Sequence, residues 1–197
     1  MGKLFVTQVE GGNMTTVSEW TDTPQGEQGA RVSWHNTLKN LWNDTNTNTA
    51  LVEIIDEDLN TLGKYREYVD KLSKYPEYDP KTEYSKGAIV GYGAKDYEYI
   101  NDEASTGNLP TDTEYWKEYV PDGKLFVMKV SNNNLVSKET TEWAPTRTGR
   151  NGAMVDYHSK CATLWNAPDV ITATVKILNE NLNTVENNSE DINHEVE

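Results

Sequence analysis

One segment occurs twice in the chain, and this duplication constrains the fold more than any other feature of the sequence. The pentapeptide Gly-Lys-Leu-Phe-Val at 2–6 recurs at 123–127. From Trp20 to Leu62 a constant offset then relates the first copy to the second, without insertion or deletion. So ordered a series of identities indicates a duplicated structural unit. The matched pairs include Trp20/Trp143, Gly26/Gly149, Gly29/Gly152, His35/His158, Trp42/Trp165, Val52/Val175 and Ile54/Ile177.

Each copy is predicted to begin with a β-hairpin followed by a short helix. Apolar segments at 4–9 and 125–130 precede turn-prone tetrads, Glu-Gly-Gly-Asn and Ser-Asn-Asn-Asn, and a second short segment follows each tetrad. A glycine-containing loop then leads to Ser33 or Asp156, both of which are good N-cap residues. The next residues are predicted to form an amphipathic helix. Its apolar face in the first copy consists of Trp34, Leu38, Leu41 and Trp42.

The last part of each copy has apolar residues in alternating steps of three and four, which predicts a long heptad helix. A narrow apolar stripe on a polar helix cannot be buried within so small a chain, so we expect self-association as a parallel coiled coil, a homotrimer. The alternative is an intrachain hairpin between the two helices. The oligomer seam is predicted at Val175, Leu178, Leu182, Val185, Ile192 and Val196, and its first-copy counterpart at Val52, Ile55, Leu59, Leu62, Arg66 and Val69.

Charge and hydropathy exclude several classes of partner. The formal net charge is -14, from 32 acidic and 18 basic residues, and it would repel phosphate backbones and anionic lipid surfaces. No apolar run reaches the roughly 20 residues of a membrane helix, and no signal-peptide core follows Met1. We therefore expect no nucleic-acid or membrane partner. The chain is expected to be made in a host cytoplasm and to leave it inside an assembled virion, the alternative being that it stays in the cytosol.

Between the copies the composition shifts to Tyr, Gly, Asp and Lys, which predicts a small antiparallel sheet at 78–120. The spacing Tyr84-x-x-Gly87-x-x-Val90-x-Tyr92, followed by Tyr97, Gly107-x-x-Pro110 and Trp116, resembles the chitin-binding type modules of carbohydrate-binding families 5 and 12. These modules also occur in bacteriophage tail and fibre proteins. The resemblance implies a small β fold. It also implies a glycan-binding surface, which we place at Tyr92, Tyr97, Tyr99, Trp116 and Asp96.

Two observations limit the sugar-binding interpretation of this segment. Where chitin-binding relatives carry stacking aromatics, this chain has Ile100 and Asn101, so we expect chitin itself to be bound poorly. The same tyrosines and tryptophan are also the large apolar side chains around which so small a module must fold. A role in the module's core is therefore the alternative to sugar contact.

No residue pattern in the chain predicts catalysis, a cofactor or a metal. His35 and His158 are equivalent positions of the repeat, so a shared structural role is the simpler interpretation, with a proton switch as the alternative. The only cysteine, Cys161, stands where the first copy has Leu38 and is expected to pack as an apolar residue. Acidic clusters such as 53–58 are expected to be the solvated flank of a helix.

These observations lead to one interpretation of the chain. The fold class is α+β, a duplicated β-hairpin plus helix repeat with heptad coiled-coil helices and a small all-β inserted module, in an elongated oligomer. The expected domains are 1–76, 77–121 and 122–197. The expected function is that of a structural virion protein, a phage head-fibre, tail-fibre or decoration component that contacts other virion proteins and a host-surface glycan. The alternative is a carbohydrate-binding accessory module of a secreted glycoside hydrolase.

Overall fold

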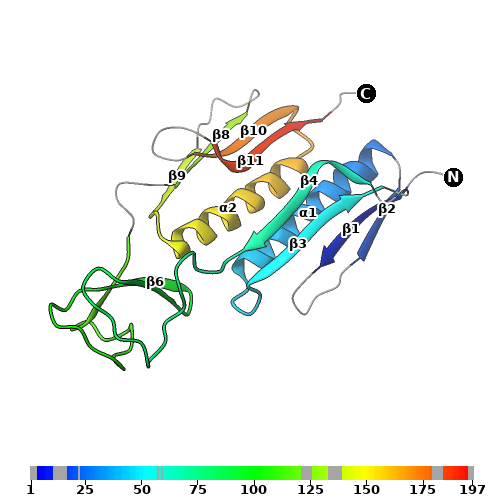
Figure 1. Ribbon diagram of the computed structural model, residues 1–197. Helices are drawn as coiled ribbons and strands as arrows, with labels where there is room; N and C mark the ends of the chain where they lie inside the picture. Colours follow the sequence, from blue (N-terminus) through cyan, green and yellow to red (C-terminus); the bar gives the residue numbers. More distant parts are fainter. Residues whose placement is uncertain are drawn as a thin grey trace.

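The computed structural model describes residues 4–10, 17–21, 23–56, 58, 60–120, 126–132, 139–178 and 184–194. Two similar halves flank a small sheet (Figure 1). The first half contains β1 (Leu4–Glu10), β2 (Val17–Thr21), α1 (Pro24–Asn43), β3 (Thr49–Ile55) and β4 (Thr61–Asp70). The second contains β8 (Phe126–Asn132), β9 (Glu139–Trp143), α2 (Arg147–Trp165), β10 (Thr172–Leu178) and β11 (Thr184–Asn193).

The two halves have the same sheet order and the same strand register. Four antiparallel strands are ordered β2-β1-β3-β4 in the first half, and the equivalent order in the second is β9-β8-β10-β11. Thr49 lies opposite Asp70 in the first sheet, and Thr172 lies opposite Asn193 in the second. The same sequence offset that relates Trp20 to Trp143 relates Thr49 to Thr172 and Asp70 to Asn193. The sequence duplication therefore corresponds to matched positions in the two sheets.

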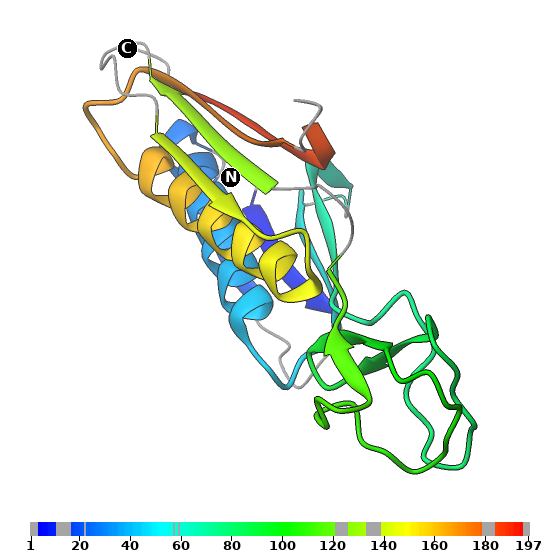
Figure 2. The same ribbon diagram turned by 90° about the vertical axis from the view of Figure 1, so that its left-hand side faces the viewer.

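The helices α1 and α2 lie side by side, and each sheet covers its own helix (Figures 1 and 2). Inward-facing residues of the strands alternate with half-exposed ones, as in β3, where Ala50, Val52 and Ile54 are buried. Side chains from both halves form a single apolar core. Its fully buried members include Leu38, Val52, Ile54, Val69, Cys161, Val175 and Ile177.

The predicted heptad helices are wrong, because these segments form strands. Val175 and Leu178 lie in β10, and Val185 and Ile192 lie in β11. In the first copy the corresponding residues belong to β3 and β4, and Leu59, Leu182 and Val196 lie outside the described residues. Over stretches this short, a three-four spacing and a strand alternation share many positions, and β-branched residues favour the strand.

This correction also removes the predicted oligomer seam. Val175, Leu178 and Ile192 are buried inside the chain, so they cannot form a surface between copies. Each unit is a hairpin, a helix and a second hairpin, so the α+β mixture of the predicted fold agrees with the structure and the coiled-coil helices do not. The intrachain helical hairpin proposed for the same segments is equally wrong.

The helices begin ten residues earlier than predicted from the expected N-caps Ser33 and Asp156. The N-caps are Thr23 and Thr146, whose hydroxyl groups accept hydrogen bonds of 3.0 Å from the backbone N–H groups of Gly26 and Gly149. The glycines predicted to form a loop are therefore helical. They are needed because the first turn of each helix lies directly against the end of the preceding strand: a Cβ on Gly26 would lie 1.9 Å from the carbonyl oxygen of Thr21.

This packing predicts different effects for two glycine-to-alanine substitutions. Gly26→Ala should lower the free energy of unfolding by about 1–3 kcal/mol, because a backbone carbonyl cannot rotate away from the added methyl group. In Gly152→Ala the methyl group meets only the Trp143 ring, 3.2 Å away, and the gain of about 1 kcal/mol in helix propensity should offset the crowding. Urea denaturation of both variants tests this, and equal losses would contradict it.

The inserted segment forms a separate small unit at one end of the two helices (Figure 2). Its sheet has the order β5-β6-β7, with strands Ile89–Tyr92, Lys95–Tyr99 and Trp116–Glu118. Tyr84, Val90, Tyr99 and Trp116 form an apolar cluster distinct from the core of the two halves. We call residues 77–119 the inserted module.

Candidate functional site

A buried pair of histidines joins the two halves. His35 on α1 and His158 on α2 are both fully buried, and their Nδ1 atoms are 2.9 Å apart. A hydrogen bond between two ring nitrogens requires one donor and one acceptor. The Nε2 atom of His158 lies 3.1 Å from a carboxylate oxygen of Glu67, so it donates there. With both rings neutral, His35 therefore donates from Nδ1 to His158.

Two glutamates at equivalent positions close this arrangement at either end. Trp42 donates from Nε1 to Glu67, and Trp165 donates from Nε1 to Glu190, each at 2.9 Å. Each glutamate thus bonds the tryptophan of its own half, and it faces the histidine of the other half. The second of these contacts is longer, with 3.9 Å between His35 Nε2 and Glu190 Oε1. We call Trp42, Glu67, His158, His35, Glu190 and Trp165 the central polar chain.

In the central polar chain the neutral form of His35 is favoured, together with the charged forms of Glu67 and Glu190. Burial lowers the pKa of His35 to about 4, although Glu190 beside it acts in the opposite direction. Burial alone would raise the pKa of Glu190, but His35 and the Lys64 ammonium, 2.7 Å away, lower it to about 2. Burial likewise opposes the lowered pKa of Glu67, which His158 and Trp42 stabilise as a carboxylate.

Glu67 and Glu190, at the two ends of the central polar chain, differ in the number of hydrogen bonds that they accept. Glu190 also accepts a hydrogen bond of 2.8 Å from the hydroxyl group of Tyr65, in β4 of the other half. The position equivalent to Tyr65 is Asn188, so Glu67 has no such donor from the second half. Glu190 therefore links β11 to β4 as well as to α2. It makes a larger contribution to the contact between the two halves than Glu67 does.

Most of these groups bond one another, which indicates a structural role, and within the central polar chain Nε2 of His35 is the buried atom that has no hydrogen-bond partner among the described residues. The carboxylates hold indole and imidazole donors, and the cleft of about 220 Å³ that reaches Glu67 and Glu190 also contains Lys64, which is paired with Glu190. Cys161 is fully buried, and burial raises the pKa of its thiol, so it packs as an inert apolar side chain. Among the residues that the structure describes, no three His, Cys, Asp or Glu side chains gather to hold a metal ion.

The residues predicted to bind a glycan are split between the core and the surface of the inserted module. Tyr99 and Trp116 are each 1% exposed, and their rings meet edge to face at 4.9 Å, so neither has a free face for a sugar. Tyr92 and Tyr97 are partly exposed and lie 6.5 Å apart, and any stacking on this surface depends on them. Asp96 accepts a hydrogen bond of 2.7 Å from Ser73.

Asp96 belongs to the contact that fixes the module to α2. The Nε atom of Arg147 lies 3.7 Å from the Asp96 carboxylate, and an Nη2 atom donates to the carbonyl oxygens of Gly93 at 2.5 Å and Lys95 at 3.0 Å. Arg150 donates to Asp70, just before the module begins, at 3.0 Å. These arginines occur only in the second copy, where the first has Pro24 and Glu27, so the module is held by α2 and not by α1.

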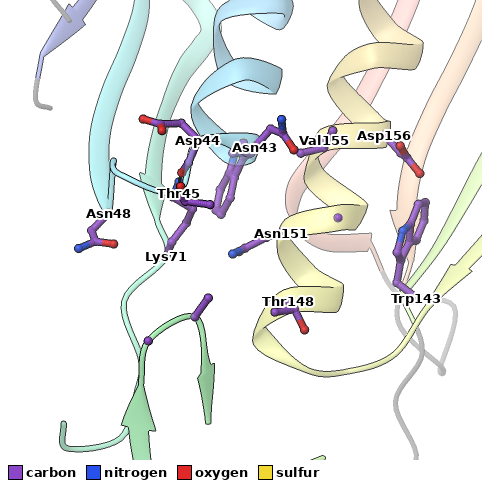
Figure 3. A pocket seen from close by; sticks show the side chains of 14 residues that line it. Asn43, Asp44, Thr45, Asn48, Lys71, Trp143, Thr148, Asn151, Val155 and Asp156 are labelled. Carbon is purple, nitrogen blue, oxygen red and sulfur yellow. Dashed lines mark hydrogen bonds between the residues drawn. The ribbon is translucent and has the colours of Figure 1, made fainter. Parts of the chain in front are cut away.

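Docking of the module against α2 encloses a cleft of about 740 Å³ (Figure 3). Its walls are the end of α1, Lys71, the β5–β6 turn at Gly93 and Ala94, Trp143, and the outer face of α2. Most of the labelled side chains are polar, and they include Asn48 after α1 and Thr148 and Asn151 on α2. We call this the α2 cleft.

A smaller groove of about 580 Å³ lies at the equivalent place on α1. It is lined by Trp20, Gln28, Gly29 and Ser33, the counterparts of Trp143, Asn151, Gly152 and Asp156. No residue of the inserted module contributes to its lining. The duplication therefore supplies the same groove twice, and the module converts only one of them into the deeper cleft.

The sequence contains indications of both sites. Glu67 and Glu190 continue the constant offset beyond the last identity that was matched, and they share it with the two histidines. Trp20 and Trp143 were matched, as were Gly29 and Gly152, but nothing in a single sequence shows that each pair borders a groove. The bonding partners and the cleft become visible only once strands and helices are placed.

Comparison with known proteins provides no relative for this chain. No protein-family model, no curated protein and no solved structure matches it. None of the described helices is long and apolar enough to cross a membrane. Inferences about its function therefore depend on its own geometry and on the resemblance of the inserted module.

Proposed function

We propose that the chain is a structural component of a virus particle, a phage head-fibre, tail-fibre or decoration protein that contributes to adhesion at the host surface. The observation that carries this proposal is the separation of body and module. The duplicated body has one continuous core, and the inserted module has its own aromatic cluster at one end of that body. A body and a module with separate cores suit a protein whose body is anchored and whose small module is exposed for recognition.

The connections of the module support this division. Tyr75 on the entering segment and Tyr119 on the leaving segment meet edge to face, with ring centroids 5.5 Å apart. The module is thus attached through a narrow neck and through the Arg147 contact described above. The sequence of 78–120 resembles modules that occur in phage fibres, and this resemblance favours a virion setting over an accessory module of a secreted hydrolase.

The proposed partners are other virion proteins at the body and a host-surface glycan at the module end, with no nucleic acid, no membrane and no cofactor. The proposal includes no catalytic activity, because the buried carboxylates and histidines bond one another. A homotrimer stays a prediction, although Val175, Leu178 and Ile192 of the seam on which it rested are buried inside the chain. Several linked copies of a weak binding surface would gain avidity from assembly.

Particle fractionation tests this proposal. We expect the chain to co-purify with intact particles through a density gradient, and an antibody against the module to label their outer surface in electron micrographs. Replacing 77–119 with a glycine-serine linker, which the proximity of Tyr75 and Tyr119 permits, should leave incorporation unchanged and slow adsorption to host cells. A chain absent from purified particles, or found joined to a hydrolase domain, would contradict the proposal.

A further inference from the structure

We propose that the α2 cleft binds a neutral oligosaccharide. This inference rests on the adhesive role proposed above, and it places the ligand in the cleft between module and body, away from Tyr92 and Tyr97. The cleft volume of about 740 Å³ lies within the range typical of small-molecule sites. Its walls are fixed before any ligand arrives, because Arg147 holds the β5–β6 turn by two hydrogen bonds.

The charges around the cleft exclude an anionic ligand. The ammonium group of Lys71 donates to the carbonyl oxygens of Leu41, at 2.8 Å, and Asp44, so this cation is already engaged. Hydrogen bonds from Thr47 and Asn46 lower the pKa of the Asp44 carboxyl, which is therefore charged at neutral pH, and Asp156 adds a second carboxylate. Phosphorylated or carboxylated ligands would be repelled.

The polar groups of the cleft suit hydroxyl groups. The side chain of Asn151 extends from α2 toward the space beside Thr148 with its amide nitrogen outermost (Figure 3), whereas its carbonyl oxygen is buried and accepts no hydrogen bond within the described residues. The amide nitrogen of Asn151 can donate a hydrogen bond to a ligand hydroxyl group. Asn48 and Thr148 offer further amide and hydroxyl groups at the rim. A ligand rich in donors and free of charge fits this set.

An aromatic side chain completes the recognition surface. Trp143 lies against Gly152 of α2, where even an added Cβ would be 3.2 Å from the ring, and it is partly exposed at the cleft. Indole rings present an apolar surface to the C–H faces of sugar rings, and they tolerate hydroxyl groups at their edges. The combination of indole, amides and hydroxyls, without a free cation, is the argument for an oligosaccharide.

The experiment probes the full chain with an array of neutral oligosaccharides of hexoses and N-acetylhexosamines, followed by affinity measurements on those that bind. Asn151→Ala should weaken binding about tenfold, because the ligand loses one well-placed hydrogen bond. Ala94→Arg should abolish it, because Ala94 is an exposed turn residue whose enlargement fills the cleft without disturbing a core. Unchanged thermal unfolding would show that both variants are folded.

Matched controls separate this inference from its alternatives. Gln28→Ala removes the equivalent amide from the groove on α1, and Ala104→Arg adds the same bulk to an exposed module residue outside the cleft; neither should change the affinity. The inference is overturned if no neutral oligosaccharide binds, or if a peptide from a library binds in place of an oligosaccharide. It is also overturned if oligosaccharide binding survives Ala94→Arg, or if Tyr97→Ala is the one substitution that removes it. Particle fractionation tests the virion role independently, so either proposal can fail alone.

Discussion

Replacing Glu190 with alanine is expected to lower the free energy of unfolding by about 3–5 kcal/mol, the cost of breaking a buried charged pair by removing one partner. The substitution deprives Trp165 and Tyr65 of their acceptor and leaves Lys64 without its carboxylate partner. Because these donors come from both halves, the loss should also loosen the contact between β4 and β11. Urea denaturation followed by tryptophan fluorescence measures the effect.

Two further variants make this result specific. Glu190→Gln keeps an oxygen acceptor of the same shape, so its loss should be smaller than that of Glu190→Ala. Asp191→Ala alters the exposed neighbour on the same strand and should change the free energy of unfolding by no more than about 0.5 kcal/mol. If Glu190→Ala cost no more than Asp191→Ala, the central polar chain would not stabilise the fold.

Stability is expected to fall as the pH is lowered from about 6.5 toward 4, because His35 is buried in its neutral form. In the unfolded chain a histidine takes up a proton below its usual pKa of 6.5, whereas the folded chain resists protonation until about 4. The contribution is therefore fully present above pH 6.5. This difference between the pKa values of the unfolded and folded states corresponds to a loss of roughly 3 kcal/mol in the free energy of unfolding between pH 6.5 and pH 4.

The second buried group extends the loss to lower pH. Glu190 keeps its charge in the folded state down to about pH 2, while an unfolded glutamate is protonated near 4.5, so its contribution disappears between those values. Both groups act in the same direction, and the protein should be least stable in acid. Urea denaturation at a series of pH values measures the combined dependence.

A variant identifies the histidine responsible. His35→Asn retains a side-chain amide that can donate to His158 and removes the titrating ring, so its stability should depend less steeply on pH between 6.5 and 4. An unchanged slope in this variant would show that the proton is taken up elsewhere.

The duplication and the module could be predicted from the sequence because both depend on local patterns. Identities at a constant offset mark equivalent positions whatever the fold, and the strands of the first hairpin lie where alternating apolar residues predicted them. The helix boundaries were missed because Gly26 and Gly149 suggested a loop. The reason for these glycines is the close approach of a strand end, which leaves no trace in local composition.

The choice between heptad helices and strands needed the tertiary structure. Around Val52 and Val175, the apolar spacing over so few residues fits both a helix and a strand. The surface against which these side chains can be buried decides between the two. Pairing of β3 with β1 and β4 satisfies the backbone and places Val52 against α1. The resulting burial inside one chain removed the predicted surface between copies.

The sequence by itself determined that two equivalent units and a distinct aromatic-rich insertion are present, because identity and composition are properties of the order of residues. Only the tertiary structure decided that His35 meets His158 and that Glu67 and Glu190 each face the histidine of the other half. It also decided that the insertion lines one of two grooves at equivalent positions. Such contacts join residues far apart in the chain, and their energies depend on distance, burial and orientation, which a linear pattern does not contain.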